Sequence, residues 1–557
     1  MSAGACRMVA AVAMLLITSL PAVAQIPASE LPGRERDRFV QPQAPRAQPS
    51  GTVISLPSTV APPGAESVKV RVRRVRVTGS TVYGALDFAP LYDDIVGREV
   101  ALTAIYEIAQ RITTKYGNDG YVLSRAIVPP QELTPGGAEI RIQVVEGYID
   151  KVEWPASLSR YRDFFSDYTA KILASRPTNV KVLERYLLLA ADLPGLKFKN
   201  SLKPSTSAQG AATLVVEVEE KPIDYNGRVD NRGTKARGPW QHFNSVTVNN
   251  LTRGHESWTA SYAAATQSKE LRYGVIGYRQ VLTSEGLTVF ANQSFSRSKP
   301  GTALLELLEY ETKGRSTEAG ISYPVIRQRE RNLIVTALLF ATNDQSDILQ
   351  TLNTLDRLRG VRARMESDLA DPLGGINQFN AVASQGFDGL DSTKNGSLFA
   401  SRANGRVDFT KLEGTYVRTQ PLMANVSLLV AAYAQYARTP LLAPELCGYG
   451  GRAFGRAFNP SELVGDSCVQ VLGELRYDIP HGLQGVTQLQ LYGFADRGWL
   501  HNIAPVAGTP ANLDSASAGG GFRFGLQPRM TVDLSAAKGI VGLRDEWRYF
   551  LIATGRY

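Results

Sequence analysis

Residues 224–557 carry a repeating pattern of short strands and no recognisable helix. Apolar and polar side chains alternate within each segment, and Gly, Asn, Asp or Ser separates one segment from the next. In residues 530–536, for example, every second side chain is apolar. A period of two places the apolar side chains on one face of a strand and the polar ones on the other. A β region of this length indicates a closed barrel or an array of sandwiches.

The average composition does not reveal a barrel. Hydrophobic residues make up 43% of the chain and charged residues 20%, and the mean hydropathy of −0.14 is typical of a soluble protein. After residue 24 no apolar run approaches the ~18–20 residues that a membrane helix needs. A helical membrane transporter is therefore excluded. A membrane β-barrel is not, because its strands alternate apolar and polar residues.

A soluble array of β-sandwiches would show the same alternation, so it stays an alternative. At ~20 residues per strand and connection, residues 224–557 hold roughly 14–18 strands. The chain ends at Tyr557, and Tyr549, Leu551 and Ala553 share its strand face. The unbroken β length, the terminal aromatic and a predicted export signal favour the membrane barrel. Tyr557 is then expected to act as its C-terminal signal.

The N-terminus predicts export. Arg7 precedes an apolar stretch, residues 8–20, which is followed by Pro21 and the small residues 22–24. This order is typical of a secretory signal peptide, residues 1–24, and an uncleaved anchor is the alternative. Residues 25–67 are Pro-rich and are expected to form an extended linker. A short helix over residues 29–39 is left open, because Pro32 weakens it.

Two cysteines remain after the expected cleavage. Cys447 and Cys468 lie 21 residues apart around a Gly-rich segment. In an oxidising compartment they are expected to close that segment as a disulfide loop. Two unpaired thiols are the alternative, and two metal ligands alone would make a poor zinc site.

Residues 68–147 and 148–221 share one order of predicted elements, β-α-α-β-β. The first region has predicted strands near 68–73, 121–128 and 140–145 and a helix with an apolar face over 102–112. The second has predicted strands at 149–154, 196–202 and 213–218 and helices at 161–173 and 180–189. The repeated order indicates two small α+β domains. The all-β region follows as residues 222–557.

Enzymatic motifs are absent from the sequence. It contains no GxSxG elbow, phosphate loop, HExxH or CxxC. The four histidines, His242, His255, His481 and His501, are expected at the surface. We therefore predict no catalytic residues, no metal and no cofactor. The net charge of +9 comes from scattered basic residues, so nucleic acid is not an expected partner.

Four short motifs in residues 68–147 point to a family: Gly120-Tyr121-Val122, Pro129-Pro130-Gln131, Gly136-Gly137 and Val144-Val145-Glu146-Gly147. With them the region resembles a polypeptide-transport-associated (POTRA) domain of the haemolysin and adhesin secretion/activation proteins, which are outer-membrane transporters of two-partner secretion. Asp230-Asn231-Arg232-Gly233-Thr234, followed by Gly238, resembles their first barrel strand and its loop. The resemblance covers residues 68–557, with the parts in the same order.

The resemblance implies a fold class of α+β periplasmic POTRA-like domains followed by an all-β transmembrane barrel of sixteen strands. Residues 25–67 stand where the family carries a pore-plugging helix and its linker. The expected location is an outer membrane of the Gram-negative type, with the N-terminal domains in the periplasm.

A long loop folds back into the pore in this family and carries Val-Arg-Gly followed by Tyr or Phe. Gly455-Arg456-Ala457-Phe458 stands in that place, with Ala457 where the family has Gly. The exchange bears on the turn geometry, because Ala does not adopt positive φ freely. The family's Phe-x-Asp-x-Gly motif is present as Phe494, Asp496 and Gly498. The resemblance implies that Arg456 reaches Asp496 inside the barrel.

The residue pattern agrees with this placement. Asp496 is in phase with Gln488 and Gln490, which predicts that it faces the lumen while Leu491 and Ala495 face lipid. Residues 437–469 lack a clear strand pattern, and loops of this length are usually functional or disordered. The alternative is that Arg456 is an ordinary solvated residue and Asp496 one lumen carboxylate among many.

The resemblance implies a function in protein secretion. The barrel is expected to translocate an unfolded exoprotein of the haemolysin or adhesin type to the cell surface, without nucleotide hydrolysis. Expected partners are this cargo, outer-membrane lipid and the barrel-assembly machinery that inserts the barrel. A barrel assembly or insertion factor of the same superfamily, a porin-like channel and a soluble adhesive β-protein are the alternatives.

Overall fold

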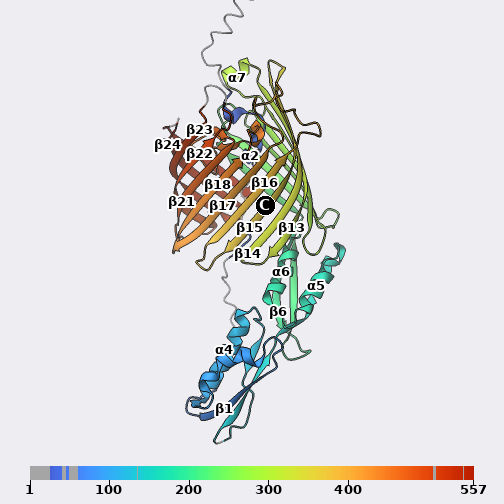
Figure 1. Cartoon of the computed structure of the whole chain (residues 1–557), viewed down its shortest axis with the longest axis vertical. Coiled ribbons are helices and arrows are strands. Elements are labelled where there is room, and N and C mark those ends of the chain that lie inside the picture. The colour runs from blue at the N-terminus through green and yellow to red at the C-terminus, as the bar shows by residue number, and fades with distance from the viewer. Residues whose placement is uncertain (1–25, 40–44, 49–59, 135, 506–509, 543–544) are drawn as a thin grey trace, which may run out of the picture.

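The computed structural model describes residues 26–39, 45–48, 60–134, 136–505, 510–542 and 545–557. The predicted signal peptide, residues 1–24, lies outside this part of the chain. Figure 1 shows a barrel and two small α+β units that follow one another away from one of its ends. Among the described residues, no helix is both long and apolar enough to cross a membrane.

The first small unit is built on a four-stranded sheet in the order β2-β1-β4-β3. Its elements are β1 (Lys69–Thr78), α3 (Ala85–Phe88), η2 (Ala89–Leu91), η3 (Asp93–Ile95), β2 (Glu99–Ala101), α4 (Leu102–Asn118), β3 (Arg125–Ile127) and β4 (Ala138–Val145). The apolar face of α4 is buried in the core, with Ile105, Ile108 and Ile112 at most 1% exposed. Packing of one helical face on the sheet therefore holds this unit together.

The first unit differs from its prediction in two places. The strand predicted over 121–128 is only Arg125–Ile127, because the Ser124 amide bonds the Tyr121 carbonyl and closes a turn. The short edge strand β2 was not expected, and α3 takes the place of the first predicted helix, for which no bounds were predicted. Both are too short to leave a clear period in the sequence.

Glu146, from one of the four POTRA-like motifs, closes the loop before α3. Its carboxylate accepts hydrogen bonds from the Thr81 amide at 2.7 Å, the Val82 amide at 3.2 Å and the Tyr116 hydroxyl at 2.8 Å. Burial raises the pKa of Glu146, but the hydrogen bonds from Thr81 and Tyr116 outweigh it and hold the pKa below the ordinary value. The carboxylate thus joins the loop to α4.

The second small unit contains a three-stranded sheet in the order β5-β7-β6. Its elements are β5 (Tyr148–Glu153), η4 (Ala156–Arg160), α5 (Phe165–Ala174), α6 (Val180–Ala191), β6 (Leu196–Pro204) and β7 (Ala211–Glu220). The element order matches the prediction, but α5 begins at Phe165 and not at Tyr161. The reason is Asp163, whose side chain accepts hydrogen bonds from the Phe165 and Ser166 amides and caps the helix there.

Within the described residues, sixteen strands form one closed barrel in which sequence neighbours pair antiparallel, apart from the inserted β19–β20 hairpin. They are β8 (Ile223–Asp230), β9 (Gln241–Asn249), β10 (Glu256–Ala265), β11 (Arg272–Val281), β12 (Thr288–Ser298), β13 (Glu311–Arg327), β14 (Arg331–Ile348), β15 (Thr351–Ala370), β16 (Ile376–Gly386), β17 (Thr410–Met423), β18 (Val426–Ala437), β21 (Ser467–Asp478), β22 (Val486–His501), β23 (Asn512–Leu526), β24 (Met530–Val541) and β25 (Trp547–Arg556). The ring closes where β25 pairs with β8. The predicted barrel of sixteen strands is confirmed.

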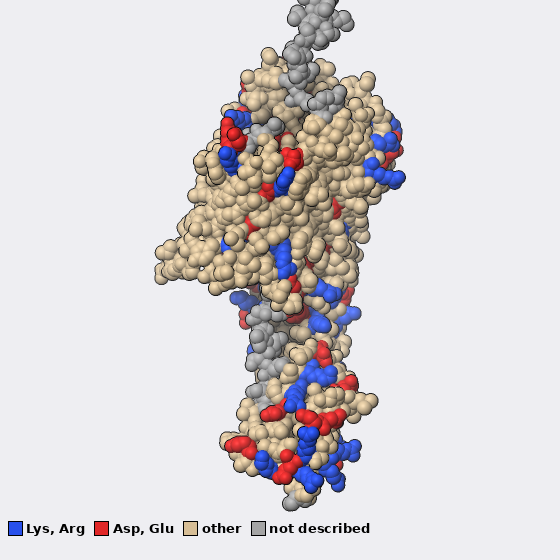
Figure 2. All heavy atoms as spheres, turned by 60° about the vertical axis from the view of Figure 1, so that its left-hand side comes forward, with Lys and Arg blue, Asp and Glu red and all other residues tan. Residues whose placement is uncertain are grey.

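The two faces of the barrel wall have the predicted chemistry. Along β22 the even-numbered residues from Gln490 to Leu500 are buried inside, and the odd-numbered residues from Leu491 to Trp499 are exposed outside. Figure 2 shows the middle of the outer wall as mostly uncharged, whereas Lys, Arg, Asp and Glu gather on the small units. A low-charge outer belt on a closed ring is what a lipid bilayer requires.

Polar contacts fix the second unit to one end of the barrel. Arg327, at the end of β13, donates to both carboxylate oxygens of Asp192, which follows α6, at 2.7 and 2.9 Å. Arg185 of α6 forms an ion pair of 2.9 Å with Glu285 in the β11–β12 turn. The end of the barrel that carries these turns is therefore the end expected to face the periplasm.

His255 lies in this junction and corrects the prediction that all four histidines are at the surface. Its side chain is fully buried, and its Nε2 lies 2.7 Å from the carbonyl oxygen of Arg162. Its ring stacks on Tyr161 and packs against Phe164. Burial lowers the pKa of His255 below its ordinary value, which favours the neutral ring.

The hydrogen bonds of Glu146 predict a pH-dependent loss of stability. Glu146→Gln should speed hydrogen exchange in the loop at residues 80–83 by an amount equivalent to about 1–2 kcal/mol at neutral pH. The low folded-state pKa makes this stabilisation fully present above the ordinary carboxyl pKa of 4.5. It is lost as the pH falls through the lowered value, so the wild type and the variant should converge in acid.

Hydrogen–deuterium exchange of the full chain at several pH values measures this difference. Glu139→Gln is the matched control, since Glu139 lies on an exposed strand face and, among the described residues, forms an ion pair with the exposed Arg76 alone. Equal exchange in the two variants at neutral pH would contradict the role of Glu146.

Candidate functional site in the barrel lumen

Residues 26–39, which we call the plug, lie inside the barrel. They form a 3-10 turn, η1 (Ala28–Glu30), and a helix, α2 (Glu35–Phe39), that begins after Pro32. Ile26 packs near Leu305 of α7 (Ala303–Leu307), which Figure 1 places at the barrel end far from the small units. Gln48 donates to the Arg329 carbonyl in the β13–β14 turn, at the periplasmic end. Residues 26–39 thus lie in the lumen and Gln48 at its periplasmic end. Of the helix that the sequence left open over residues 29–39, only Glu35–Phe39 is present.

A buried arginine of the first barrel loop holds the plug. Arg237 is 0% exposed, and its Nε lies 2.7 Å from Glu30 Oε2 while its NH1 bonds Glu35. Its NH2 also donates to the Glu30 carbonyl at 2.8 Å. Loss of one partner would leave an uncompensated buried charge, which costs several kcal/mol. This arginine therefore contributes strongly to the position of the plug.

Arginines of the plug reach the barrel wall and the loop between β18 and β21. Arg36 donates to Asp344 Oδ2 and Thr342 Oγ1 of β14, both at 3.1 Å. Arg34 donates to the Leu446 carbonyl at 2.7 Å and to Ser461 Oγ at 2.8 Å. The plug is thus bound on two sides by polar contacts.

Residues 438–466, which we call the infolded loop, return into the lumen after β18. They contain the turn η5 (Ala443–Glu445) and a small hairpin of β19 (Cys447–Tyr449) and β20 (Leu463–Gly465). Tyr449 and Ala457 are fully buried and Phe458 is 2% exposed. The expected loop is therefore packed inside the barrel and is not a solvated surface loop.

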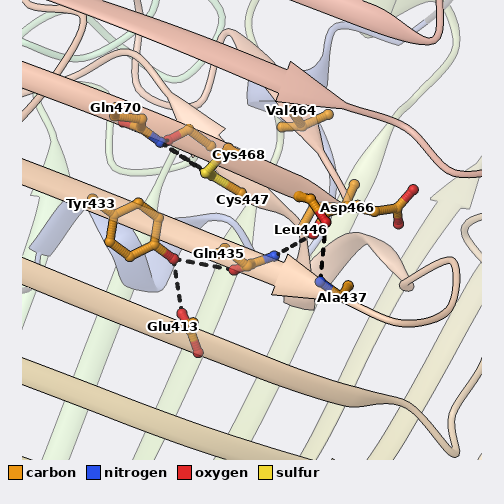
Figure 3. Close-up of a disulfide and its surroundings, with 12 residues drawn as sticks. Glu413, Tyr433, Gln435, Ala437, Leu446, Cys447, Val464, Asp466, Cys468 and Gln470 are labelled. Carbon is orange, nitrogen blue, oxygen red and sulfur yellow. Dashed lines mark hydrogen bonds between the residues drawn. A yellow bond between two sulfur atoms is a disulfide. The ribbon is translucent and has the colours of Figure 1, made fainter.

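A disulfide joins the infolded loop to the wall. Cys447 of β19 is bonded to Cys468 of β21, with their Cα atoms 6.3 Å apart. Figure 3 shows Gln470 against the disulfide, and its Nε2 also donates to the Gly448 carbonyl at 3.0 Å. The side chain of Gln435, on β18, donates to the Asp466 carbonyl at 2.9 Å. The regions near the two ends of the infolded loop are thereby fixed to neighbouring wall strands.

Asp496 binds the turn of the infolded loop. Its carboxylate accepts hydrogen bonds from the Tyr449 hydroxyl at 2.5 Å and the Gly455 amide at 2.9 Å. The Arg456 amide lies 3.3 Å from Oδ2, and the Ser517 hydroxyl of β23 lies 2.9 Å from both oxygens. Asp496 therefore faces the lumen as predicted and contacts Arg456 through the backbone.

The guanidinium of Arg456 does not reach Asp496 but pairs with Glu474 on β21, which corrects the expected side-chain contact. Glu474 is fully buried and also pairs with Arg476 at 2.7 Å and Arg523 at 2.9 Å. The Arg456 guanidinium lies 4.6 Å from the centre of the Phe494 ring. The two motifs therefore meet. Asp496 binds backbone amides of the turn, whereas Glu474 binds the guanidinium of Arg456.

The remaining motif residues shape this contact. Gly455 has φ of +65°, so it takes the left-handed position of the turn and Ala457 does not need to. A Cβ at Gly498 would collide with the Tyr449 ring, so a glycine there lets the loop approach the wall. Phe458 packs on Tyr449 with ring centres 5.6 Å apart. The exchange of the family Gly for Ala457 therefore leaves the turn intact.

Four residues of the site were not foreseen: Arg237, Tyr449, Glu474 and Ser517. Glu474 alternates with apolar neighbours on β21, which marks a lumen-facing position, but many lumen carboxylates share that signal. Arg237 lies in the loop that follows the family-like 230–234 motif. Tyr557, the expected C-terminal signal, lies at the barrel seam, where its amide bonds the Tyr225 carbonyl at 2.9 Å.

Replacement of Asp496 should release the infolded loop. Asp496→Ala removes the acceptor of the Tyr449, Gly455 and Ser517 hydrogen bonds and leaves buried donors unpaired, at about 1–3 kcal/mol each. We expect trypsin to cleave after Arg452 or Arg456 at least ~10 times faster in the purified full-length variant. Each loss of about 1.4 kcal/mol raises the population of the open loop tenfold, and cleavage follows that population.

The control for this experiment is Asp514→Asn. Asp514 lies on β23 and pairs with Arg497, and both side chains are nearly half exposed. Cleavage in the loop that is as slow in Asp496→Ala as in Asp514→Asn would contradict the anchoring role of Asp496.

Comparison with known families gives two matches along the chain. A family model described as haemolysin secretion/activation protein ShlB/FhaC/HecB matches residues 210–524, which is more than half of the chain. A model described as POTRA domain, ShlB-type, matches residues 70–147.

Individual relatives are distant in sequence. The heme/hemopexin transporter protein HuxB of Haemophilus influenzae (strain 86-028NP) is 23% identical over 321 residues, which are 56% of this chain and 55% of that protein. The outer membrane transporter CdiB of Dickeya dadantii (strain 3937) is 21% identical over 463 residues, 80% of this chain and 79% of that protein. The chain thus spans just over half of HuxB and about four fifths of CdiB.

The fold agrees with a solved structure. CdiB from Escherichia coli superposes with a TM-score of 0.67 at 19% identity, over 90% of this chain and 94% of that one. Two α+β units, a closed ring of sixteen strands, a plugged lumen and the two family-model matches agree with one another. The chain belongs to the haemolysin secretion/activation protein family ShlB/FhaC/HecB, the outer-membrane components of two-partner secretion.

Proposed function

We propose that this protein recognises an unfolded partner exoprotein in the periplasm and conducts it through the barrel to the cell surface, without nucleotide hydrolysis. The observation that carries the proposal is a lumen occupied by two inserts, the plug and the infolded loop, which buried ion pairs hold in place. A secretion pore needs them, because an open barrel wide enough for a polypeptide would leak solutes.

Strand edges of the periplasmic units support the capture of an extended chain. In the described part of the second unit, β6 is an edge strand of nine residues, and residues 197 and 199–204 are exposed. An extended segment can add to such an edge through backbone hydrogen bonds, whatever its side chains. Lys197, Lys199 and Lys203 on this strand discourage self-association of two copies and leave the edge for a partner.

The contacts of the lumen suit a pore that a polypeptide can open. Arg36 and Arg34 bind the plug through polar atoms of the wall and the infolded loop, and the backbone and side chains of an incoming chain can offer the same atoms. Folding of the emerging cargo outside the cell then makes transport one-directional. Outer-membrane lipid surrounds the barrel in this proposal, and the barrel-assembly machinery inserts it.

Arg456→Ala should abolish or strongly reduce secretion while the protein still reaches the membrane. The change removes one of three arginines around the buried Glu474 and the contact with Phe494, so the turn loses its position. Secretion is measured as exoprotein in the culture medium relative to transporter in the membrane fraction. Arg497→Ala is the matched control, because Arg497 lies on β22 but faces outward. Normal secretion by Arg456→Ala would refute the role assigned to this residue.

Deletion of residues 68–147 should block cargo capture and leave a pore. The barrel closes its ring without any strand of the first unit, and the contacts that fix the barrel to a small unit come from the second unit. We expect no exoprotein in the medium, together with unchanged heat-modifiable gel mobility of the truncated barrel. Unchanged export by this deletion would contradict the capture step.

A further inference from the structure

Cations stand side by side on the outer wall of the barrel, near the end that carries α7. Arg272 of β11 lies directly opposite Arg297 of β12, and Arg297 lies directly opposite Lys313 of β13. Directly opposite residues on neighbouring antiparallel strands have Cα atoms about 4.5–5.5 Å apart. Arg315 lies two residues further along β13 and shares the face of Lys313. We call these four exposed side chains the basic row.

Carboxylates balance only part of this charge. Glu311 of β13 forms ion pairs with Arg297 and, at 3.9 Å, with Lys313, and Asp347 of β14 lies 2.9 Å from Lys313. Glu311 is also shared with Lys299, at 3.5 Å. Two carboxylates thus serve three cations.

The other two members of the basic row, Arg272 and Arg315, form no ion pair with a described residue. Arg272 donates to the carbonyl and hydroxyl oxygens of Ser268, at 2.9 and 3.2 Å, which are uncharged acceptors. The guanidinium of Arg315 lies 5.8 Å from the centre of the Phe295 ring, its direct neighbour on β12. Like charges directly opposite one another destabilise a sheet. An anion bound over the row would therefore offset a repulsion that the described chain leaves in place.

The basic row lies between the apolar outer wall and the carboxylates. On the outer face of β13, Ile321 is 50% exposed, Arg315 comes next toward α7, and Glu311 lies beyond it. On β11, Ile276 is 57% exposed and lies four residues from Arg272 on the same face. The cost of a charged side chain on the lipid face of a barrel falls from the bilayer centre to its interface. This level of the wall is therefore where the headgroups of a leaflet meet the protein.

This position selects an amphiphilic anion. Phosphate oxygens accept several charge-assisted hydrogen bonds, and the guanidinium of arginine suits their geometry. The basic row spans three strands, about 10 Å at the usual strand spacing, which is wider than one phosphate group. Because the row is on the outside of the closed ring, acyl chains of the same ligand can cover exposed side chains such as Ile276 and Phe295. A free phosphate would gain no such apolar contact.

We propose that the basic row binds the headgroup of a lipid that carries at least two phosphate groups, in the leaflet at the α7 end of the barrel. This end lies far from the small units, so the leaflet is the outer one. The phosphates offset the repulsion between Arg272, Arg297 and Lys313, and the bound lipid fixes one arc of the wall, β11 to β13, at the membrane surface. This site goes beyond the proposed secretion function, and its test uses no cargo.

The probe is diphosphoryl lipid A, titrated into the purified full-length protein in a neutral, lipid-free detergent and counted on the protein by native mass spectrometry. The main variant, Arg272→Gln with Arg315→Gln, removes two cations without breaking an ion pair to a described residue. The control is Lys538→Gln, which removes an outward cation of β24 whose direct cross-strand neighbours are Ala518 and Trp547. We expect the affinity for lipid A to be about tenfold lower in the main variant and unchanged in the control. Absence of a lipid adduct on the wild type, or equal affinity in the main variant and the control, would overturn the proposal.

A variant with the opposite effect on charge separates binding from damage to the fold. Glu311→Gln removes a carboxylate that competes for Arg297 and Lys313, so it should bind lipid A about threefold more tightly than the wild type. Unchanged or weaker binding by Glu311→Gln would contradict an electrostatic site at the basic row.

Two comparison ligands identify the source of the phosphate. Monophosphoryl lipid A lacks one phosphate and should bind more weakly, whereas equal binding would contradict the requirement for two phosphates. Sodium pyrophosphate carries the charge without acyl chains and should displace lipid A only at a much higher concentration. Displacement at a concentration equal to that of lipid A would show that the site takes a free anion, and the lipid assignment would then be wrong.

Discussion

The ring of backbone hydrogen bonds, completed where β25 meets β8, is the constraint on which the rest of the structure depends. Closure satisfies the backbone groups of the wall strands in lipid, and it creates an inner surface that carries every second side chain. That inner surface is polar and charged, with Glu474, Asp496 and Asp344 at low exposure. Charges in a confined lumen need partners, and the plug and the infolded loop supply them.

The two members of each of these ion pairs come from different elements, one from the barrel and one from an insert. Wall carboxylates bind arginines of the inserts, as in Arg456 with Glu474 and Arg36 with Asp344, while Arg237 of the first barrel loop binds two carboxylates of the plug. Each such contact is strong only while both members are in place, because a buried charge that loses its partner is costly. The inserts therefore have defined positions in the lumen. The disulfide between Cys447 and Cys468 ties the base of the infolded loop to the wall.

Strand alternation predicted a barrel of roughly 14–18 strands and the inward direction of Asp496, because this pattern is local and repeats along hundreds of residues. The number sixteen came from the resemblance to the family. The resemblance also placed both motifs of the infolded loop and the wall. The sequence did not predict that Arg456 reaches Glu474. It cannot distinguish one lumen-facing carboxylate from another until the register of β21 and β22 is known. The burial of His255 and the role of Arg237 were missed for the same reason: both depend on contacts between segments about 90 to 200 residues apart. The short helix α2 has five residues, too few for a helical period to appear.

Photo-crosslinking from the plug tests the central claim that the plug occupies the resting lumen and leaves it during transport. Phe39 stacks on Phe243 and Tyr273 of the wall, with ring centres 6.3 and 5.1 Å apart. Benzoylphenylalanine at position 39 keeps an aromatic group at this contact. We expect efficient crosslinks to β9 and β11 in cells without the partner exoprotein, and a clear loss of these crosslinks while the exoprotein is being secreted. An equal yield of crosslinks during active secretion would contradict this claim.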